Sequence, residues 1–176
     1  MIRSATPADG AACAEIYLPS VAEGVASLED EPPGADDMTR RIRAIQRTHP
    51  WLVDERDGEL AGYAYASRHH DRSAYRWATD VTVYVAERQK RKGVARGLYG
   101  RLFELVREQG FTVACAGITL PNAASVALHE AFGFEPVGVY RRVAWKLGEW
   151  RDVGWWQLDL LPMGDERPAE PRGPSA

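Results

Sequence analysis

The sequence has no long apolar run and only two cysteines among its 176 residues. A helix needs about 20 consecutive apolar residues to span a bilayer, so no membrane segment is predicted. The first residues also lack the apolar core of a signal peptide. Cys13 and Cys115 lie far apart, without cysteine or histidine companions at metal-ligand spacing. We therefore expect a cytoplasmic protein with two reduced thiols, no disulfide framework and no metal.

An excess of positive charge is also missing. The chain carries 22 basic and 25 acidic side chains, which gives a net charge of −3. Nucleic-acid-binding domains usually concentrate basic residues on one face, so a nucleic-acid partner is not favoured. Neither the phosphate loop that ends in Gly-Lys-Ser/Thr nor the Gly-x-Gly-x-x-Gly fingerprint occurs. P-loop NTPases and Rossmann dinucleotide enzymes are therefore not indicated.

What is present is the pattern of one α/β domain. Hydrophobic residues make up 45% of the chain, which suits a single sizeable core at this length. Antiparallel strands are predicted first, and a strand–helix–strand–helix–strand order follows, which predicts a mixed sheet flanked by helices. We expect the folded domain to span residues 1–161. Residues 162–176 are rich in proline, glycine and charge and are expected to form a flexible C-terminal tail.

Three local predictions concern the first third of the chain. A helix should follow Pro7, and Pro19 is expected to break it early. A second helix should begin with Asp36 or Asp37 as its cap and end near Thr48. The segment Arg56-Asp57-Gly58-Glu59 is a hairpin turn signal between two strands.

An anion site is indicated at the middle of the chain. A strand ending at Val85 leads into a basic turn, and a helix begins at Gly93. Free backbone N–H groups and the helix dipole at such a start attract anions. The turn crowds four basic residues, which suits a phosphate-rich ligand. An ordinary capped helix with solvated basic residues would explain the same residues equally well.

Two motifs resemble the GNAT acetyltransferases. Lys90-Arg91-Lys92-Gly93-Val94-Ala95 resembles the family's Arg/Gln-x-x-Gly-x-Gly/Ala signature, with lysine at its first position. The run from Asn122 to Phe134 resembles the second half of the family pattern. The resemblance implies a GNAT fold, a mixed and mostly antiparallel sheet of about seven strands flanked by helices, and acetyl-CoA as co-substrate. The cofactor-binding residues that it implies are Val83, Tyr84, Val85, Lys90, Arg91, Lys92, Gly93, Val94, Ala95, Arg96 and Asn122.

The resemblance narrows to phosphinothricin N-acetyltransferases and related enzymes of small amino acids. The segments that carry it are His49-Pro50-Trp51-Leu52-Val53, Ser73-Ala74-Tyr75-Arg76-Trp77, Thr82-Val83-Tyr84-Val85, Leu120-Pro121-Asn122 and Trp150 to Asp159. The family's catalytic glutamate falls on Asp80, which is one methylene shorter and could act on the amine through a water. His129 occupies the place of the group that protonates the leaving thiolate. Each of the two has a structural alternative, Asp80 as a strand-end ion-pair partner and His129 as a helix packing residue.

The same resemblance implies which residues contact the substrate. Arg72 and Tyr75 match two substrate contacts, and a guanidinium suits an α-carboxylate or a phosphinate. Leu28 stands where the group has an aromatic residue, which makes methionine sulfoximine, methionine sulfone or another compact amino acid as plausible an acceptor as phosphinothricin. A homodimer is expected, as in relatives. The alternatives are an enzyme acting on a protein N-terminus or an aminoglycoside, and a non-catalytic acyl-CoA-binding sensor.

Overall fold

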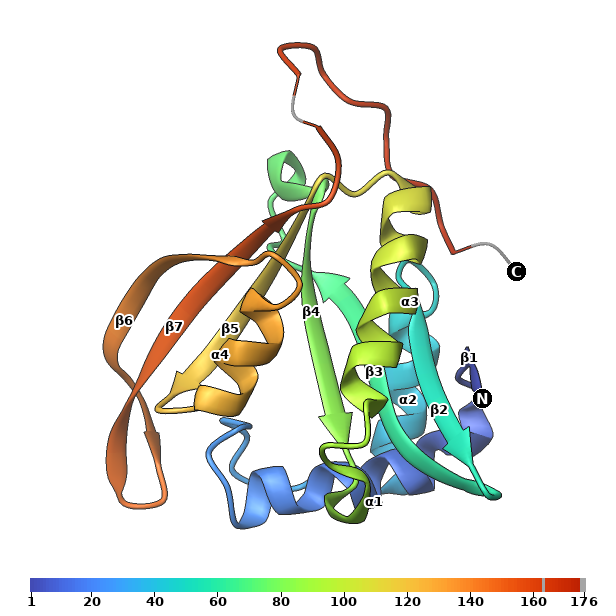
Figure 1. Ribbon diagram of the computed structural model, residues 1–176, viewed down its shortest axis with the longest axis vertical. Helices are drawn as coiled ribbons and strands as arrows, with labels where there is room; N and C mark the ends of the chain where they lie inside the picture. The colour runs from blue at the N-terminus through green and yellow to red at the C-terminus, as the bar shows by residue number, and fades with distance from the viewer. Residues whose placement is uncertain (163, 175–176) are drawn as a thin grey trace.

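The protein is described here by a computed structural model that covers residues 1–162 and 164–174. It confirms the predicted α/β class: one seven-stranded sheet, in the order β1-β2-β3-β4-β5-β7-β6, is flanked by four α-helices (Figure 1). All neighbouring strands are antiparallel except β4 and β5, which are parallel. The helices are α1 Gly10–Ala22, α2 Ala35–Ile45, α3 Val94–Gln109 and α4 Ala123–Glu130, and the strands are β1 Ile2–Ser4, β2 Trp51–Arg56, β3 Glu59–Arg68, β4 Ala78–Val85, β5 Val113–Leu120, β6 Glu135–Lys146 and β7 Glu149–Asp159.

The hairpin turn between β2 and β3 is confirmed. Asp57 and Gly58 adopt positive φ angles of 52° and 80°. Two central residues with positive φ match the right-handed twist of the flanking strands, and Asp-Gly tolerates this geometry well.

Two helix boundaries differ from prediction. Helix α1 continues through Pro19 to Ala22, so the predicted early break is wrong; burial of Tyr17 and Val21 on either side of the proline stabilises the helix against the lost hydrogen bond. Helix α2 begins one residue after Gly34. Its two aspartates lie in the first turn and do not cap it, and there they still interact favourably with the helix dipole.

The sheet separates two apolar cores. Helices α3 and α4 pack over one face, in a cluster that includes Val81, Leu98 and Ala116. Helices α1 and α2 cover part of the other face, where Trp51, Tyr63 and the ring of Tyr84 pack. Successive side chains of a strand point to opposite faces, so Asp80 and Tyr84 lie on the face opposite α3. Only side chains on this same face of the sheet can contact Asp80.

Strands β4 and β5 diverge along their length (Figure 1). They pair only through Ala78, Thr79 and Asp80, opposite Val113, Ala114 and Cys115. Among the described residues, the rest of β4, from 81 to 85, pairs with β3 alone. The sheet is thus split by a V-shaped opening whose apex is the Asp80–Cys115 pair.

The C-terminal segment returns across the upper end of α3 (Figure 1). Arg172 and Gln109 exchange two hydrogen bonds of 2.8 Å, and the Trp77 indole donates to the Ala169 carbonyl at 2.8 Å. The division into a domain of residues 1–161 and a flexible tail of 162–176 stays a prediction, and Met163, Ser175 and Ala176 lie outside the described residues. No helix in the described ranges has the length and apolar character needed to cross a membrane.

Candidate active site

The start of α3 has the geometry of an anion cradle. Gly93 precedes the helix with φ +79°, a left-handed conformation that glycine adopts without strain. No side chain in the described part of the chain caps this end, and the first helical hydrogen bond joins the Gly97 N–H to the Gly93 carbonyl. The backbone N–H groups of Val94, Ala95 and Arg96 therefore have no partner within the helix and are available to an anion.

The basic residues of the turn divide into two groups. Arg88 is paired with Glu59, and Lys90 with Glu87. Arg91, Lys92 and Arg96 form no ion pair with any residue in the described part of the chain, and all three are exposed. These three cations are the ones free to meet a phosphate group.

Gly62 on β3 brings the cradle close to the sheet. A Cβ atom at this position would lie 2.7 Å from the Tyr84 carbonyl oxygen and 2.8 Å from the Val94 side chain. Only glycine therefore allows β3, β4 and the first turn of α3 to approach this closely. The close contact places the cradle at the open end of the β4–β5 split.

The edge of β4 that faces the opening has backbone groups without a strand partner in residues 1–162 and 164–174. Val83, Tyr84 and Val85 lie on this stretch. The Tyr84 ring turns to the other face and packs edge-on against Tyr17 at 4.6 Å, so the residue can offer only its backbone to the opening. This is where an extended pantetheine chain can form strand-like hydrogen bonds.

Asn122 caps α4. Its side-chain oxygen accepts a hydrogen bond of 3.1 Å from the Ser125 N–H. Substituting such a cap by alanine typically costs about 1 kcal/mol. Its expected contact with the cofactor stays a prediction.

Asp80 is hydrogen-bonded to His69, a residue that no sequence motif indicates. His69 Nδ1 lies 2.6 Å from Asp80 Oδ1. Ser67 is the residue of β3 opposite Asp80, and His69 follows two positions later, so both project to the same face as Asp80. Burial raises the pKa of the Asp80 carboxyl, and the hydrogen bond from His69 opposes that rise.

Cys115 completes this cluster from β5. Its sulfur and the ligand-type atoms of His69 and Asp80 all lie within 4.8 Å of one another. Burial raises the pKa of the Cys115 thiol to about 11, and the Asp80 charge adds to the rise, so the thiol is neutral at physiological pH. In this structure Nδ1 of His69 and Oδ1 of Asp80 are hydrogen-bonded to each other. The expectation that the protein needs no metal stays a prediction.

His129 lies on the other side of the sheet, in the core shared by α3 and α4. It is buried, with Nδ1 2.8 Å from the Ser125 carbonyl and Nε2 3.1 Å from the Tyr99 hydroxyl. The carbonyl can only accept, so Nδ1 carries the proton and Nε2 accepts from Tyr99. Burial lowers the pKa of the imidazole. Nε2 of His129 can therefore deliver a proton only if Tyr99 passes its hydroxyl proton to it, or if the Tyr99–His129 hydrogen bond opens and Nε2 is protonated from elsewhere.

The expected substrate residues, Arg72, Tyr75 and Leu28, all lie at the surface of the protein. Arg72 is exposed, Tyr75 is 45% exposed and stacks on His70 at 4.8 Å, and Leu28 is 38% exposed. The loop that carries Leu28 is fixed by the next residue: Arg41 binds the Glu29 carboxylate through two hydrogen bonds of 2.6 and 2.8 Å.

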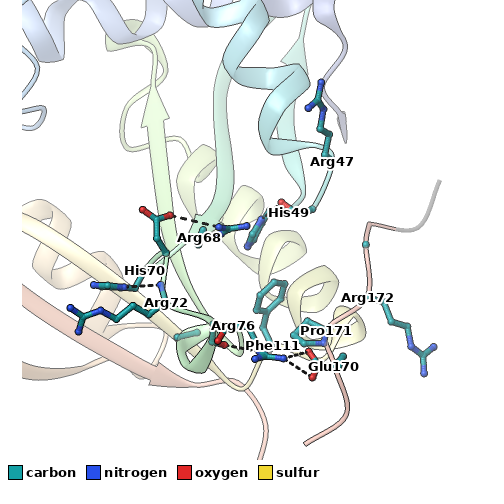
Figure 2. Close-up of a pocket in the computed structure, with 15 residues that line it drawn as sticks. Arg47, His49, Arg68, His70, Arg72, Arg76, Phe111, Glu170, Pro171 and Arg172 are labelled. Carbon is teal, nitrogen blue, oxygen red and sulfur yellow. Dashed lines mark hydrogen bonds and ion pairs between the residues drawn. The ribbon is translucent and has the colours of Figure 1, made fainter.

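A cavity of about 420 Å³ is lined in part by His70 and Arg72. Its wall includes His49 and Phe111, stacked at 4.9 Å, and the Arg76–Glu170 ion pair. Figure 2 shows Arg72 directed away from that ion pair. Neither Asp80 nor His69 lines this cavity.

Comparison with known proteins agrees with this geometry. The acetyltransferase (GNAT) domain family matches residues 2–155. The chain is 40% identical to a phosphinothricin N-acetyltransferase of Streptomyces viridochromogenes, over 97% of this chain and 93% of the relative. It is 35% identical to an L-methionine sulfoximine/L-methionine sulfone acetyltransferase of Salmonella typhimurium, over 90% and 94% of the two chains.

A solved structure of an acetyltransferase has the same fold. The phosphinothricin acetyltransferase of Sinorhizobium meliloti, in complex with acetyl-CoA, superposes with a TM-score of 0.92 at 33% identity, over 97% of this chain and 93% of that one. The predicted resemblance and fold are therefore confirmed. With the cradle, the opened sheet and the family match together, the chain belongs to the GNAT acetyltransferase family.

Proposed function

We propose that this protein transfers an acetyl group from acetyl-CoA to the amino group of a small amino-acid-like substrate such as phosphinothricin, methionine sulfoximine or methionine sulfone. The observation that carries the proposal is the β4–β5 opening, which runs from the anion cradle at Gly93 to the His69–Asp80 pair at its apex. The relatives named above act on acceptors of this class.

The cradle and the free strand edge fit acetyl-CoA. The N–H groups of Val94, Ala95 and Arg96 would hold the pyrophosphate, with Arg91 and Lys92 beside it. The backbone of Val83 and Val85 would pair with the pantetheine. A strand N–H at the reacting carbonyl would stabilise the developing oxyanion, a contribution of about 3 kcal/mol when such a donor is well placed.

The acceptor would approach from the face opposite α3. Asp80 lies on that face, and the connection after β3 supplies Arg72 and Tyr75. The Arg72 guanidinium would bind the carboxylate of the acceptor, and Tyr75 would pack on its side chain. Leu28 would offer an apolar contact in place of an aromatic wall. His129, on the α3 side of the sheet, would return a proton to the thiolate in concert with Tyr99.

The experiment that tests the proposal measures thiol release from acetyl-CoA with a panel of acceptors. The panel contains phosphinothricin, methionine sulfoximine, methionine sulfone, the common amino acids, short peptides and an aminoglycoside. Turnover is expected with at least one free amino acid, and the Arg72→Ala variant should raise KM for it. Turnover with peptides or the aminoglycoside alone would show that the acceptor is not a small amino acid. Acetyl-CoA binding without any turnover would indicate a sensor.

A homodimer formed through β6 belongs to the same proposal. This edge strand and the hairpin after it expose a row of large apolar side chains. Exposed apolar patches of this kind mark association surfaces. Light scattering should give twice the chain mass, and replacing exposed Val139 by aspartate should shift it toward the monomer. The exposed residues are Val137, Val139, Tyr140, Val143, Trp145, Leu147 and Trp150.

We also propose a cytoplasmic location. Cys13 and Cys115 are both free and buried, as expected for a protein that folds where thiols stay reduced. Fractionation of the source cells tests this directly, with recovery of the protein beside a cytoplasmic marker as the expected result.

A further inference from the structure

His69 lies where the β4–β5 opening begins. Its partner Asp80 belongs to the last pair of residues that joins the two strands. The ring of Trp155, from β7, lies edge-on to the imidazole at 5.8 Å, and Tyr75 lies 5.9 Å away. An acetyl group at the end of the opening would therefore meet the His69–Asp80 pair on the face that the acceptor enters.

We propose that His69 is the catalytic base that takes the proton from the acceptor ammonium, and that Asp80 is a positioning residue that holds the imidazole. This inference rests on the proposed function, because it assigns a role within that reaction. It changes the expectation from the sequence, in which Asp80 acts on the amine through a water.

The hydrogen bond fixes which nitrogen is free. An ionised carboxylate can only accept, so the 2.6 Å contact requires a proton on Nδ1 of His69. Nε2 then carries the lone pair in the neutral ring. Within the described residues Nε2 has no hydrogen-bond partner, and it is not among the buried unpaired nitrogens. The side chain as a whole is 24% exposed, so Nε2 is open to an incoming group.

Asp80 is less suited to the task. Its Oδ1 is occupied by His69, and its side chain is one methylene shorter than the glutamate of the family pattern. A carboxylate hydrogen-bonded to the far nitrogen of an imidazole sets the tautomer and stabilises the imidazolium. The pair therefore places a basic nitrogen further from β4 than the carboxylate alone can reach.

The connection that follows His69 also carries the proposed carboxylate ligand. Arg72 comes three residues later, and Tyr75 contacts both His69 and His70 through its ring. An α-amino acid has its ammonium and its carboxylate on the same carbon. A base and a guanidinium on one short connection match that arrangement.

The proton balance is complete with groups already named. The ammonium passes one proton to Nε2, which releases it to solvent. The free amine forms the C–N bond at the thioester carbon, and the C–S bond breaks. The second nitrogen proton leaves as the amide forms and is balanced by the proton that the thiolate sulfur gains. The products are the N-acetyl acceptor, free CoA thiol and one proton.

Among the residues that the structure describes, the titratable groups that face His69 come from three elements. They are Asp80 on β4, Cys115 on β5 and Tyr75 in the 3₁₀ turn before β4, while β7 contributes the non-titrating Trp155. Cys115 stays neutral through the assay range below its raised pKa of about 11. A change in rate between pH 6 and 9 that depends on residue 69 can therefore be assigned to this pair and the acceptor.

The test compares His69→Asn with the wild type. The asparagine amide can still donate to Asp80 but offers no base. At pH 7 the turnover rate at saturating acceptor should fall by about 10²- to 10⁴-fold, the range typical of a lost general base, with acetyl-CoA affinity and melting temperature unchanged. The deficit should shrink at least tenfold by pH 9, because more of the acceptor is already free amine. His70→Asn is the matched control: His70 stacks on Tyr75 and accepts a hydrogen bond from the Arg72 N–H, so this change should affect KM for the acceptor and leave the pH profile of the turnover rate as in the wild type. If His69→Asn does not fold, His69→Gln replaces it.

Two results would overturn the inference. One is a turnover rate within about threefold of wild type at pH 7, and the other is a deficit that is equal at pH 7 and pH 9, which would indicate a structural role. Either result with an active wild type leaves the proposed function standing. A wild type that acetylates no small amino acid would remove the proposed function and this inference together.

Discussion

Gly93 offers a sharp test of the cradle because the chain contains a matched glycine. Gly93 and Gly34 both precede an α-helix as its cap residue. A Cβ atom at either position would meet no atom of the described residues within 4 Å. The two differ in backbone conformation: φ is +79° at Gly93 and −76° at Gly34. Comparing Gly93→Ala with Gly34→Ala therefore isolates the left-handed conformation.

The magnitude follows from that difference. Holding an alanine in the left-handed region costs about 1–2 kcal/mol, whereas the cost of alanine at a helix cap is shared by both variants. For a chain of this length, each kcal/mol lowers the melting temperature by about 2–4 °C. We expect Gly93→Ala to melt about 2–8 °C below Gly34→Ala. If the turn relaxes instead, the strain returns on binding, and acetyl-CoA affinity should fall about 5- to 30-fold.

The assay is thermal unfolding together with calorimetric titration of acetyl-CoA on both variants. Strain retained in the free protein appears as a lower melting temperature, and strain relieved by rearrangement appears as weaker binding. Gly93→Ala matching Gly34→Ala in both measurements would show that the left-handed turn does not form the cradle.

Three further predictions concern other parts of the chain. Asn122→Ala should lose about 1 kcal/mol and about 2–4 °C of melting temperature, because the Ser125 N–H loses its acceptor, whereas Asn122→Ser should keep most of the stability. Burial lowers the pKa of His49 to about 4. Below pH 6.5 the unfolded chain therefore binds a proton at His49 that the folded protein does not bind, and the free energy of unfolding falls as the pH drops. Between pH 7 and 5 this loss is about 2 kcal/mol, and unfolding of His49→Phe should be correspondingly less sensitive to acid over that range. Hydrogen exchange should show a protected Arg172 amide in an otherwise fast C-terminal segment, since it donates to the Gln109 carbonyl; equal exchange along the segment would contradict that contact.

Much of the architecture follows from local sequence. The Asp57-Gly58 pair predicts its own turn because only such residues accept two positive φ angles cheaply. Asn122 predicts a cap, and the basic turn before Gly93 predicts a helix start open to anions. These signals are readable because each depends on neighbouring residues alone.

Other boundaries depend on packing. Pro19 is tolerated inside α1 because Tyr17 and Val21 anchor the helix against the sheet. Strand β6 runs to Lys146 and β7 starts at Glu149, because pairing between the two strands stabilises both up to the turn that joins them. Neither effect is visible until the partner surface is known.

The site shows the same division. The sequence by itself determined the family motifs, the cradle and Asp80, since these are runs of adjacent residues. Only the tertiary structure decided that His69 meets Asp80 across the β3–β4 register, and that His129 lies on the opposite side of the sheet. Register and sheet face arise from long-range pairing, and a shift of one residue would have turned His69 away from Asp80.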